Sequence, residues 1–118
     1  MCWQYSLHQK TPKMKNSKEC IDACMACIVE CESCLTHCIN MADKDHVNCI
    51  ALCRDCADIC ALCVRFMARN SAFAKHLCQL CADICKACAA ECGKHTKHEH
   101  CMKCADACKK CVELCAKM

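Results

Sequence analysis

The sequence predicts an all-α protein, an antiparallel up-down-up-down four-helix bundle with a cysteine-lined core. Of the 118 residues, 22 are cysteine, and 21 of these recur in steps that alternate strictly between three and four. This is the a/d spacing with which packed helices direct one stripe of residues inward. The cysteines form four helix-sized blocks with short connections between them, and short connections favour antiparallel neighbours.

The inward-facing cysteines are the residues that we expect to bind metal. The first block contains Cys20, Cys24, Cys27, Cys31, Cys34 and Cys38, and the second contains Cys49, Cys53, Cys56, Cys60 and Cys63. The third block contains Cys78, Cys81, Cys85, Cys88 and Cys92, and the fourth contains Cys101, Cys104, Cys108, Cys111 and Cys115. Leucine would bury more apolar area at each position, so stability alone does not explain cysteine here.

The chain divides into an N-terminal arm, residues 1–16, and the bundle, residues 17–118. The arm contains the only proline, Pro12, and follows no period, so we expect it to be flexible. Cys2 lies in the arm, out of register with the other cysteines. We expect it to be an exposed, unpaired thiol, with metal binding as the alternative.

The first two helices are expected at about residues 17–40 and 46–69. Ser17 is the expected N-cap of the first helix, because its side-chain oxygen can accept a hydrogen bond from the first turn. Residues 43–45, Asp-Lys-Asp, are expected to form the turn between the two helices.

The last two helices are expected at about residues 71–92 and 100–117. Ser71 follows an Asn-Ser break and is the expected cap of the third helix. Gly93 is the only glycine in the chain, and it stands where helices commonly end in a left-handed residue. We therefore expect a left-handed Gly93 after the third helix.

Large apolar residues flank the cysteine stripe on three of the four helices. They are Ile21, Ile28 and Leu35 in the first helix, Leu52, Ile59 and Phe66 in the second, and Leu77 and Ile84 in the third. These side chains are expected to cover the contacts between helices and keep water from the sulfurs. The bundle should therefore fold without metal.

Composition and charge exclude several classes of protein. The formal net charge is only +3, with acidic and basic residues intermixed and few aromatic residues, so we expect no nucleic-acid partner. No stretch approaches the roughly 18 apolar residues of a membrane span, and the N-terminus lacks the apolar run of a secretory signal. We expect a cytoplasmic protein, in which thiols stay reduced.

Two uses of the cysteines are disfavoured. A purely structural core rarely needs more than a few buried cysteines, although a buried thiol does behave as a small hydrophobe. A disulfide scaffold fits poorly, because pairs within a helix meet restrictive geometry. A thioredoxin-like enzyme would need a strand before its cysteine pair, and the sequence has no strand pattern. We expect no enzymatic activity.

Metal binding leaves Cu(I) and zinc as candidates. Cu(I) is a soft ion that suits thiolate ligands, so a continuous wall of sulfur offers it many overlapping sites. Each Cu(I) can replace one thiol proton and leave the core near neutral. Zinc with four thiolates carries two negative charges, which are costly to bury. We predict multiple Cu(I) ions per chain, with zinc sequestration as the alternative.

Soft or borderline ligands also continue the a/d register beyond the cysteines. Met41, His46 and His95 are expected at one end of the bundle, beside a loop that carries His98 and His100. We call this the histidine end, and predict that Met41, His46 and His95 bind metal during its transfer. Met67 and Met118 are expected at the opposite end, which we call the methionine end. The remaining histidines, His8, His37 and His76, are expected to be solvated.

Three motifs carry a resemblance to a known family. Cys-Ala-Asp-Ile-Cys begins at Cys56 and again at Cys81, the turn at residues 91–95 reads Glu-Cys-Gly-Lys-His, and a new helix restarts at His100-Cys101. Over about residues 18–117 the chain resembles the bacterial copper storage proteins, which are cysteine-rich four-helix bundles. The resemblance, to the cytosolic branch, implies a homotetramer whose bundles store many Cu(I) ions, loaded from the end that carries histidine.

The sequence therefore predicts a cytoplasmic protein that stores Cu(I) and protects against copper toxicity. Its expected partners are copper ions and copper chaperones. A copper chaperone in its own right is the second alternative beside zinc sequestration, and it would hold only one or two ions on an exposed site.

Overall fold

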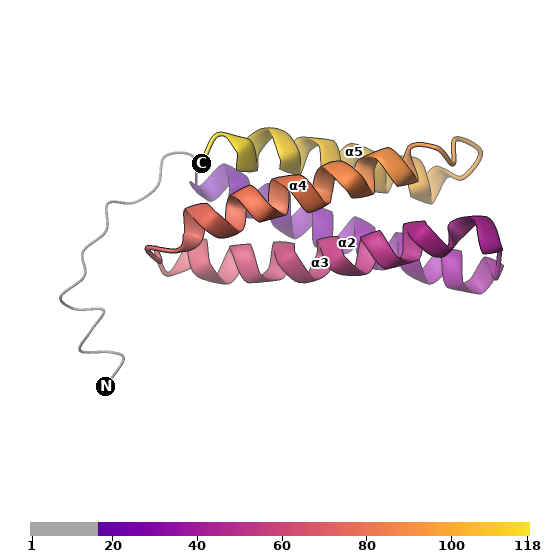
Figure 1. Ribbon diagram of the computed structural model, residues 1–118, viewed down its shortest axis with the longest axis horizontal. Helices are drawn as coiled ribbons and strands as arrows, with labels where there is room; N and C mark the ends of the chain where they lie inside the picture. Colours follow the sequence, from indigo (N-terminus) through magenta and orange to yellow (C-terminus); the bar gives the residue numbers. More distant parts are fainter. Residues whose placement is uncertain (1–16) are drawn as a thin grey trace.

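The protein is a bundle of four helices with no other layer in the part of the chain that the structure describes (Figure 1). The computed structural model describes residues 17–118, so the predicted arm and Cys2 lie outside the described residues. The elements are α2 (Ser17–Met41), the short 3₁₀ turn η1 (Lys44–His46), α3 (Val47–Ala68), α4 (Ala74–Cys92) and α5 (Glu99–Ala116). The predicted all-α bundle is confirmed.

The helices close into a ring around one core. Each helix packs against the next along the chain, and α5 returns to pack against α2. Successive helices run in opposite directions, so α2 and α4 end where α3 and α5 begin (Figure 1). The histidine end therefore gathers the ends of all four helices. No helix between residues 17 and 118 combines the length and the apolar character that crossing a membrane requires.

Helix boundaries agree with the predicted ones to within three residues, and the differences have local causes. Ser17 is not a cap, because it is itself the first described helical residue. Ser71 does not begin α4 either: its hydroxyl oxygen accepts a hydrogen bond from the Phe73 N–H at 3.1 Å, and α4 starts at Ala74. Ser71 therefore stabilises the turn before the helix. The second helix starts one residue late because His46 belongs to the 3₁₀ turn.

The prediction of a left-handed Gly93 is wrong. Gly93 has φ −63°, within the right-handed helical region, and its N–H donates to the Ala89 carbonyl at 2.9 Å. A Cβ at this position would lie 2.9 Å from that same carbonyl oxygen, so the close approach, and not the backbone angle, accounts for glycine. Among residues 17–118, the left-handed conformation belongs to Ala42 and Asn70, each with φ 52°.

Asn70 ends α3 in a Schellman motif. The Ser71 N–H donates to the Phe66 carbonyl at 2.9 Å, and the Asn70 N–H donates to the Met67 carbonyl at 3.0 Å. These two bonds satisfy carbonyls that the helix end would otherwise leave without partners. Asparagine tolerates the left-handed conformation better than most residues do, so the Asn-Ser pair both ends α3 and sets the turn to α4.

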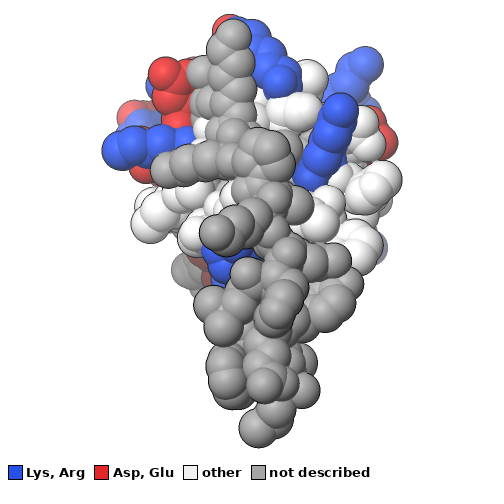
Figure 2. Space-filling view, turned by 90° about the vertical axis from the view of Figure 1, so that its left-hand side faces the viewer, with Lys and Arg blue, Asp and Glu red and all other residues white. Residues whose placement is uncertain are grey.

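The apolar cover over the sulfur core is as predicted. Ile59 is buried, and the other seven predicted residues are half-buried and packed against the core. Acidic side chains point outward, with Asp22, Asp58, Asp83 and Asp106 all exposed. Figure 2 shows basic and acidic side chains side by side on the visible outer surface of the described helices. This mixed charge offers no continuous basic face there.

Candidate metal centre

The core of the bundle is made of sulfur. All 21 cysteines of the described chain are buried, and Cys115, at 1% exposure, is the most accessible of them. They face inward because steps of three and four keep a residue on one side of an α-helix. All of them are free thiols. The a/d register that builds the bundle thus also delivers every one of these thiols to its interior.

Sulfur atoms from different helices lie close enough to share a metal ion. Across α2 and α5, Sγ of Cys24 lies 3.6 Å from Sγ of Cys111. Across α3 and α5, the Sγ atoms of Cys53 and Cys104 are also 3.6 Å apart. Across α3 and α4, Cys60 approaches Cys81 at 3.6 Å. Sites are therefore formed between helices as well as within one helix.

Several groups of four cysteines place all their Sγ atoms within 4.8 Å of one another. Such groups include Cys24, Cys60, Cys81 and Cys111; Cys27, Cys60, Cys85 and Cys111; Cys27, Cys31, Cys56 and Cys108; Cys31, Cys53, Cys88 and Cys104; and Cys34, Cys53, Cys92 and Cys104. We call these the sulfur quartets. Neighbouring quartets share members, so they form one connected array along the bundle.

Burial favours the protonated form of two thiols at the histidine end of the core, Cys38 and Cys101. Removal from water raises the pKa of Cys38 to about 12 and that of Cys101 to about 11, from an ordinary value of 9.0. Desolvation is the leading cause for both residues, because the thiolate loses more hydration than the thiol does. A soft cation that enters must therefore displace the proton, which keeps the local charge low.

His46 and His95 meet at the histidine end, as the register predicts. Their rings stack with centroids 4.0 Å apart. His46 is only 2% exposed and lies directly before α3, while His95 follows α4. Met41 is less enclosed, at 37% exposure. The structure thus brings the two histidines together and leaves the methionine at the surface.

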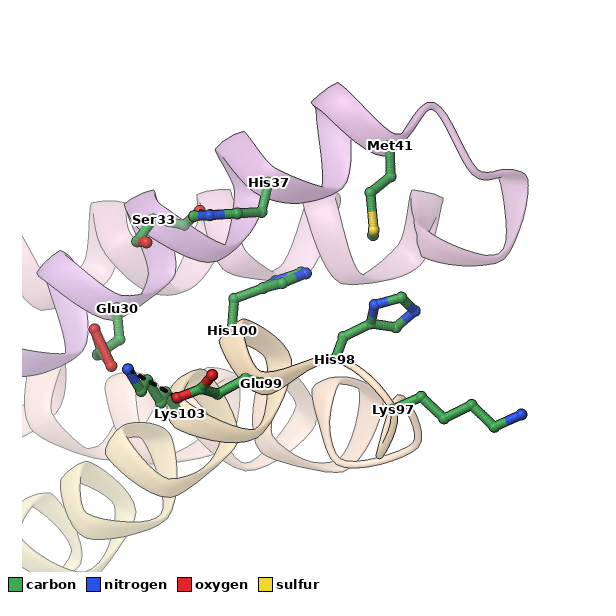
Figure 3. Close-up of a pocket in the computed structure, with 9 residues that line it drawn as sticks. All are labelled: Glu30, Ser33, His37, Met41, Lys97, His98, Glu99, His100 and Lys103. Carbon is green, nitrogen blue, oxygen red and sulfur yellow. Dashed lines mark hydrogen bonds and ion pairs between the residues drawn. The ribbon is translucent and has the colours of Figure 1, made fainter.

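A surface pocket of 450 Å³ lies beside this end, between α2 and the start of α5. Its wall contains Met41, His37, His98 and His100 (Figure 3). The Met41 sulfur points toward the two histidines of α5 and its preceding loop, as Figure 3 shows. Burial, with the neighbouring His37 and His98, lowers the pKa of His100, so neutral imidazole is favoured there.

His37 was missed as a member of this group by sequence reasoning. The prediction of a solvated side chain is correct for its exposure, as it is for His76. However, the His37 ring stacks on His100 with centroids 4.9 Å apart. One signal was available, because His37 precedes Met41 by four residues and therefore lies on the same face of α2.

The methionine end is closed by packing. Met67 is only 4% exposed, and Met118 packs against the buried core. Ser17 is also buried at this end, at 3% exposure. His46, at the opposite end of the bundle, is the one histidine of the described chain that is buried.

A family model for copper storage proteins matches residues 13–118. No curated protein sequence matches the chain.

Solved structures give the same family. The Cu(I)-bound copper storage protein BsCsp3 is 50% identical, with a TM-score of 0.83 over 88% of this chain and 98% of that chain. Apo copper storage protein 3 from Bacillus subtilis is also 50% identical, with a TM-score of 0.78 over 84% and 94% of the two chains. A cytosolic copper storage protein from Streptomyces lividans, solved with five coppers, is 32% identical, with a TM-score of 0.78 over 85% and 88%.

Proposed function

The chain belongs to the copper storage protein family, and we propose that it stores many Cu(I) ions on the thiolates of its core and so limits copper toxicity. The observation that carries the proposal is the continuity of the sulfur quartets. Because Cys60 and Cys111 each belong to two quartets, as do Cys53 and Cys104, a thiolate bound to one ion is also within reach of the next. A connected array suits a bridging ion and a large capacity.

Charge decides in favour of Cu(I) over zinc. Four of the six Sγ separations within the quartet of Cys24, Cys60, Cys81 and Cys111 lie between 3.6 and 3.9 Å, close to the roughly 3.8 Å expected around a tetrahedral zinc with 2.3 Å bonds. This geometry supports zinc sequestration as the second candidate. However, isolated zinc tetrathiolates would bury two negative charges each, whereas Cu(I) bound one per thiolate leaves the core neutral.

We assign the loading path to the histidine end. Met41, His46 and His95 are the proposed ligands that pass Cu(I) to the first thiols of the core. His46 supports this role because it is buried and stands three residues before Cys49, the first thiol of α3. Met41 supports the same role because it is partly exposed and its thioether suits a soft ion.

The protein acts by binding and not by catalysis in this proposal, and its place is the cytoplasm. The relative from Streptomyces lividans is described as cytosolic, which supports that location. We further propose a homotetramer and exchange of copper with chaperones. Exposed Met25 and Val29 on the outer face of α2, at 53% and 65% exposure, are candidates for a subunit contact.

The test is an anaerobic titration of the reduced protein with Cu(I) in the presence of a chromophoric chelator. Storage predicts that the protein withdraws many ions per chain before the chelator retains copper. A capacity of one or two ions per chain would identify a chaperone instead. Tighter retention of Zn²⁺ than of Cu(I) would identify zinc sequestration as the function.

A further inference from the structure

Two pairs of cysteines make the shortest thiol–thiol hydrogen bonds within residues 17–118. Sγ of Cys20 lies 3.0 Å from Sγ of Cys115, and Sγ of Cys49 also lies 3.0 Å from Sγ of Cys92. The next shortest of these bonds measures 3.2 Å, and the others measure 3.5 Å or more. We call Cys20–Cys115 and Cys49–Cys92 the end pairs.

Each end pair joins two helices at one end of the bundle. Cys20 is the first core thiol of α2 and Cys115 is the last of α5, so this pair lies at the methionine end (Figure 1). Cys49 is the first thiol of α3 and Cys92 is the last of α4, which places the second pair at the histidine end. Both pairs lie between helices, so the restriction on disulfides within one helix does not apply to them.

The end pairs are too close for their two sulfurs to share one metal ion as they stand. Metal–sulfur bonds of roughly 2.3 Å to two sulfurs 3.0 Å apart would enclose an angle of about 80° at the ion. A tetrahedral site needs about 109°, and a linear site needs a still wider angle. A disulfide bond of about 2.05 Å, by contrast, requires an approach of only about 1 Å. The spacing therefore favours a bond between the sulfurs.

Burial limits which oxidants can reach these thiols. Cys20, Cys49 and Cys92 are fully buried, and Cys115 is only 1% exposed. Exchange with a small-molecule disulfide requires that disulfide to meet the attacking sulfur directly, which burial prevents. A metal ion needs much less space. Cu(II) oxidises thiols and is itself converted to Cu(I), the soft ion that suits the remaining thiolates.

We propose that the end pairs reduce Cu(II), so that the protein takes up copper in either oxidation state. In each pair, the two sulfurs give one electron each to two Cu(II) ions, and the two thiol protons leave to solvent. One S–S bond forms and two Cu(I) ions result. The reaction is stoichiometric and not catalytic. Retention of the Cu(I) rests on the proposed function, whereas the reduction does not.

Oxidation of the end pairs preserves most of the sulfur array. None of the five sulfur quartets named above contains Cys20, Cys49 or Cys115, and Cys92 belongs to one of them. A Cys20–Cys115 disulfide therefore leaves all five quartets intact, and a Cys49–Cys92 disulfide removes one ligand from one quartet. The ends of the array supply electrons, and its middle keeps the ligands for Cu(I).

The reaction is tested anaerobically on the reduced, metal-free protein. The samples carry Cys2→Ser, so that the thiol outside the described residues does not contribute. Cu(II) sulfate is added in steps, EDTA removes the unreacted ion, and a Cu(I)-specific chelator and thiol alkylation measure the products. We expect about four Cu(II) to be reduced per chain in the first phase, with loss of about four thiols.

The position of the disulfides decides the assignment. Tandem mass spectrometry of alkylated peptides should find Cys20 joined to Cys115 and Cys49 joined to Cys92. Disulfides formed first at other positions overturn the proposal, as does Cu(II) that stays oxidised. This measurement uses all the core thiols, so it does not depend on whether a substituted core folds.

Variants separate the end pairs from a general loosening of the core. Cys20→Ala and Cys49→Ala should each halve the Cu(II) reduced in the first phase, and the double variant should lower it at least fivefold. Ile59→Val is the matched control, because Ile59 is buried in α3 and carries no sulfur. It should reduce as much Cu(II) as the parent. Undiminished reduction in the double variant overturns the proposal.

A Cu(I) titration of the same protein separates this inference from storage. Storage of Cu(I) without reduction of Cu(II) overturns the inference and leaves storage intact. Reduction of Cu(II) with both expected disulfides, but without retention of Cu(I), supports the end pairs and overturns storage.

Discussion

The Sγ atoms of Cys56 and Cys85 lie 3.2 Å apart across the contact between α3 and α4. Cys56 also lies 3.5 Å from Cys27 of α2 and 3.8 Å from Cys108 of α5, so this one thiol has sulfur neighbours on three other helices. All these residues are fully buried. A single core thiol can therefore contribute to metal sites with each of the other three helices.

Removal of metal should leave the fold intact. Apolar side chains cover the helix contacts, and the thiols themselves pack as small hydrophobes, so the core does not depend on metal–sulfur bonds. We expect the far-ultraviolet circular dichroism of the reduced, metal-free protein to match that of the copper-loaded protein. A spectrum that becomes helical only when copper is added would show that metal drives folding.

Alkaline pH should destabilise the metal-free protein. Burial raises the pKa of Cys38 to about 12 and that of Cys101 to about 11, whereas an exposed thiol titrates near 9.0. Between these values these two thiols hold more protons in the folded chain than in the unfolded chain, so the stability that they contribute is full below pH 9 and is lost as pH rises toward 12. Urea unfolding at a series of pH values under reducing conditions measures the loss. Constant stability over this interval would contradict the prediction.

Cys60 should matter more for copper capacity than a cysteine at the end of the array. It belongs to two sulfur quartets, so Cys60→Ala should remove more copper than the one ion that a single thiolate balances. Cys38→Ala is the comparison, because Cys38 lies at the histidine end with its Sγ 4.0 Å from that of Cys34. Capacity is measured by anaerobic titration, and equal losses in the two variants would argue against shared ligands.

Two substitutions of Cys60 distinguish its contribution to packing from its contribution to metal binding. Cys60→Ala should cost about 1 kcal/mol of apo stability through a small cavity. Cys60→Ser should cost about 1–3 kcal/mol, because its hydroxyl is harder to satisfy among thiols. Urea unfolding of both metal-free variants gives the comparison. A serine variant as stable as the parent would indicate that polar groups or water reach the core.

Ala42→Gly should stabilise the protein. Ala42 adopts φ 52°, a left-handed conformation that its Cβ makes unfavourable by about 1–2 kcal/mol. Part of this gain is offset by the greater freedom of glycine in the unfolded chain, so we expect a net increase of about 0.5–1 kcal/mol. Ala26→Gly, at an exposed position inside α2, should instead lose about 1 kcal/mol. Thermal unfolding of both variants checks the opposite signs.

A single inserted residue should damage fold and capacity together. One alanine inserted between Val29 and Glu30 rotates the rest of α2 by about 100° and turns Cys31, Cys34 and Cys38 away from the core. We expect lower helicity and lower copper uptake. The matched insertion between Thr96 and Lys97, in the connection before α5, should preserve both. Copper uptake that survives the helical insertion would show that register does not set the ligands.

The helices and their inward face could be predicted because one periodic signal specifies both. Every cysteine that the a/d register placed inward is buried, from Cys20 in α2 to Cys115 in α5. The left-handed positions were not predictable from glycine, because Ala42 and Asn70 take that conformation and Gly93 does not. Turn geometry depends on how neighbouring helices pack, which a local residue preference does not include.

The a/d register also predicted part of the histidine end. Register brings His46 and His95 to one end, and their rings do meet there. The register gives the direction of a side chain, but it does not give the distance between the ends of different helices. The stacking of His37 on His100 joins α2 to α5, so it appears only once the bundle is assembled.

The sharing of thiols between quartets has a consequence for how ions move. An ion bound near Cys60 can pass toward Cys27 or Cys24 by exchanging one sulfur at a time, without ever leaving the protein. Met67 and Met118 pack against the core at the far end, so with loading at the histidine end, as proposed, we expect ions to move in single file. The last copper to arrive should then be the first to depart, and the residence time of an ion should increase with its depth in the bundle.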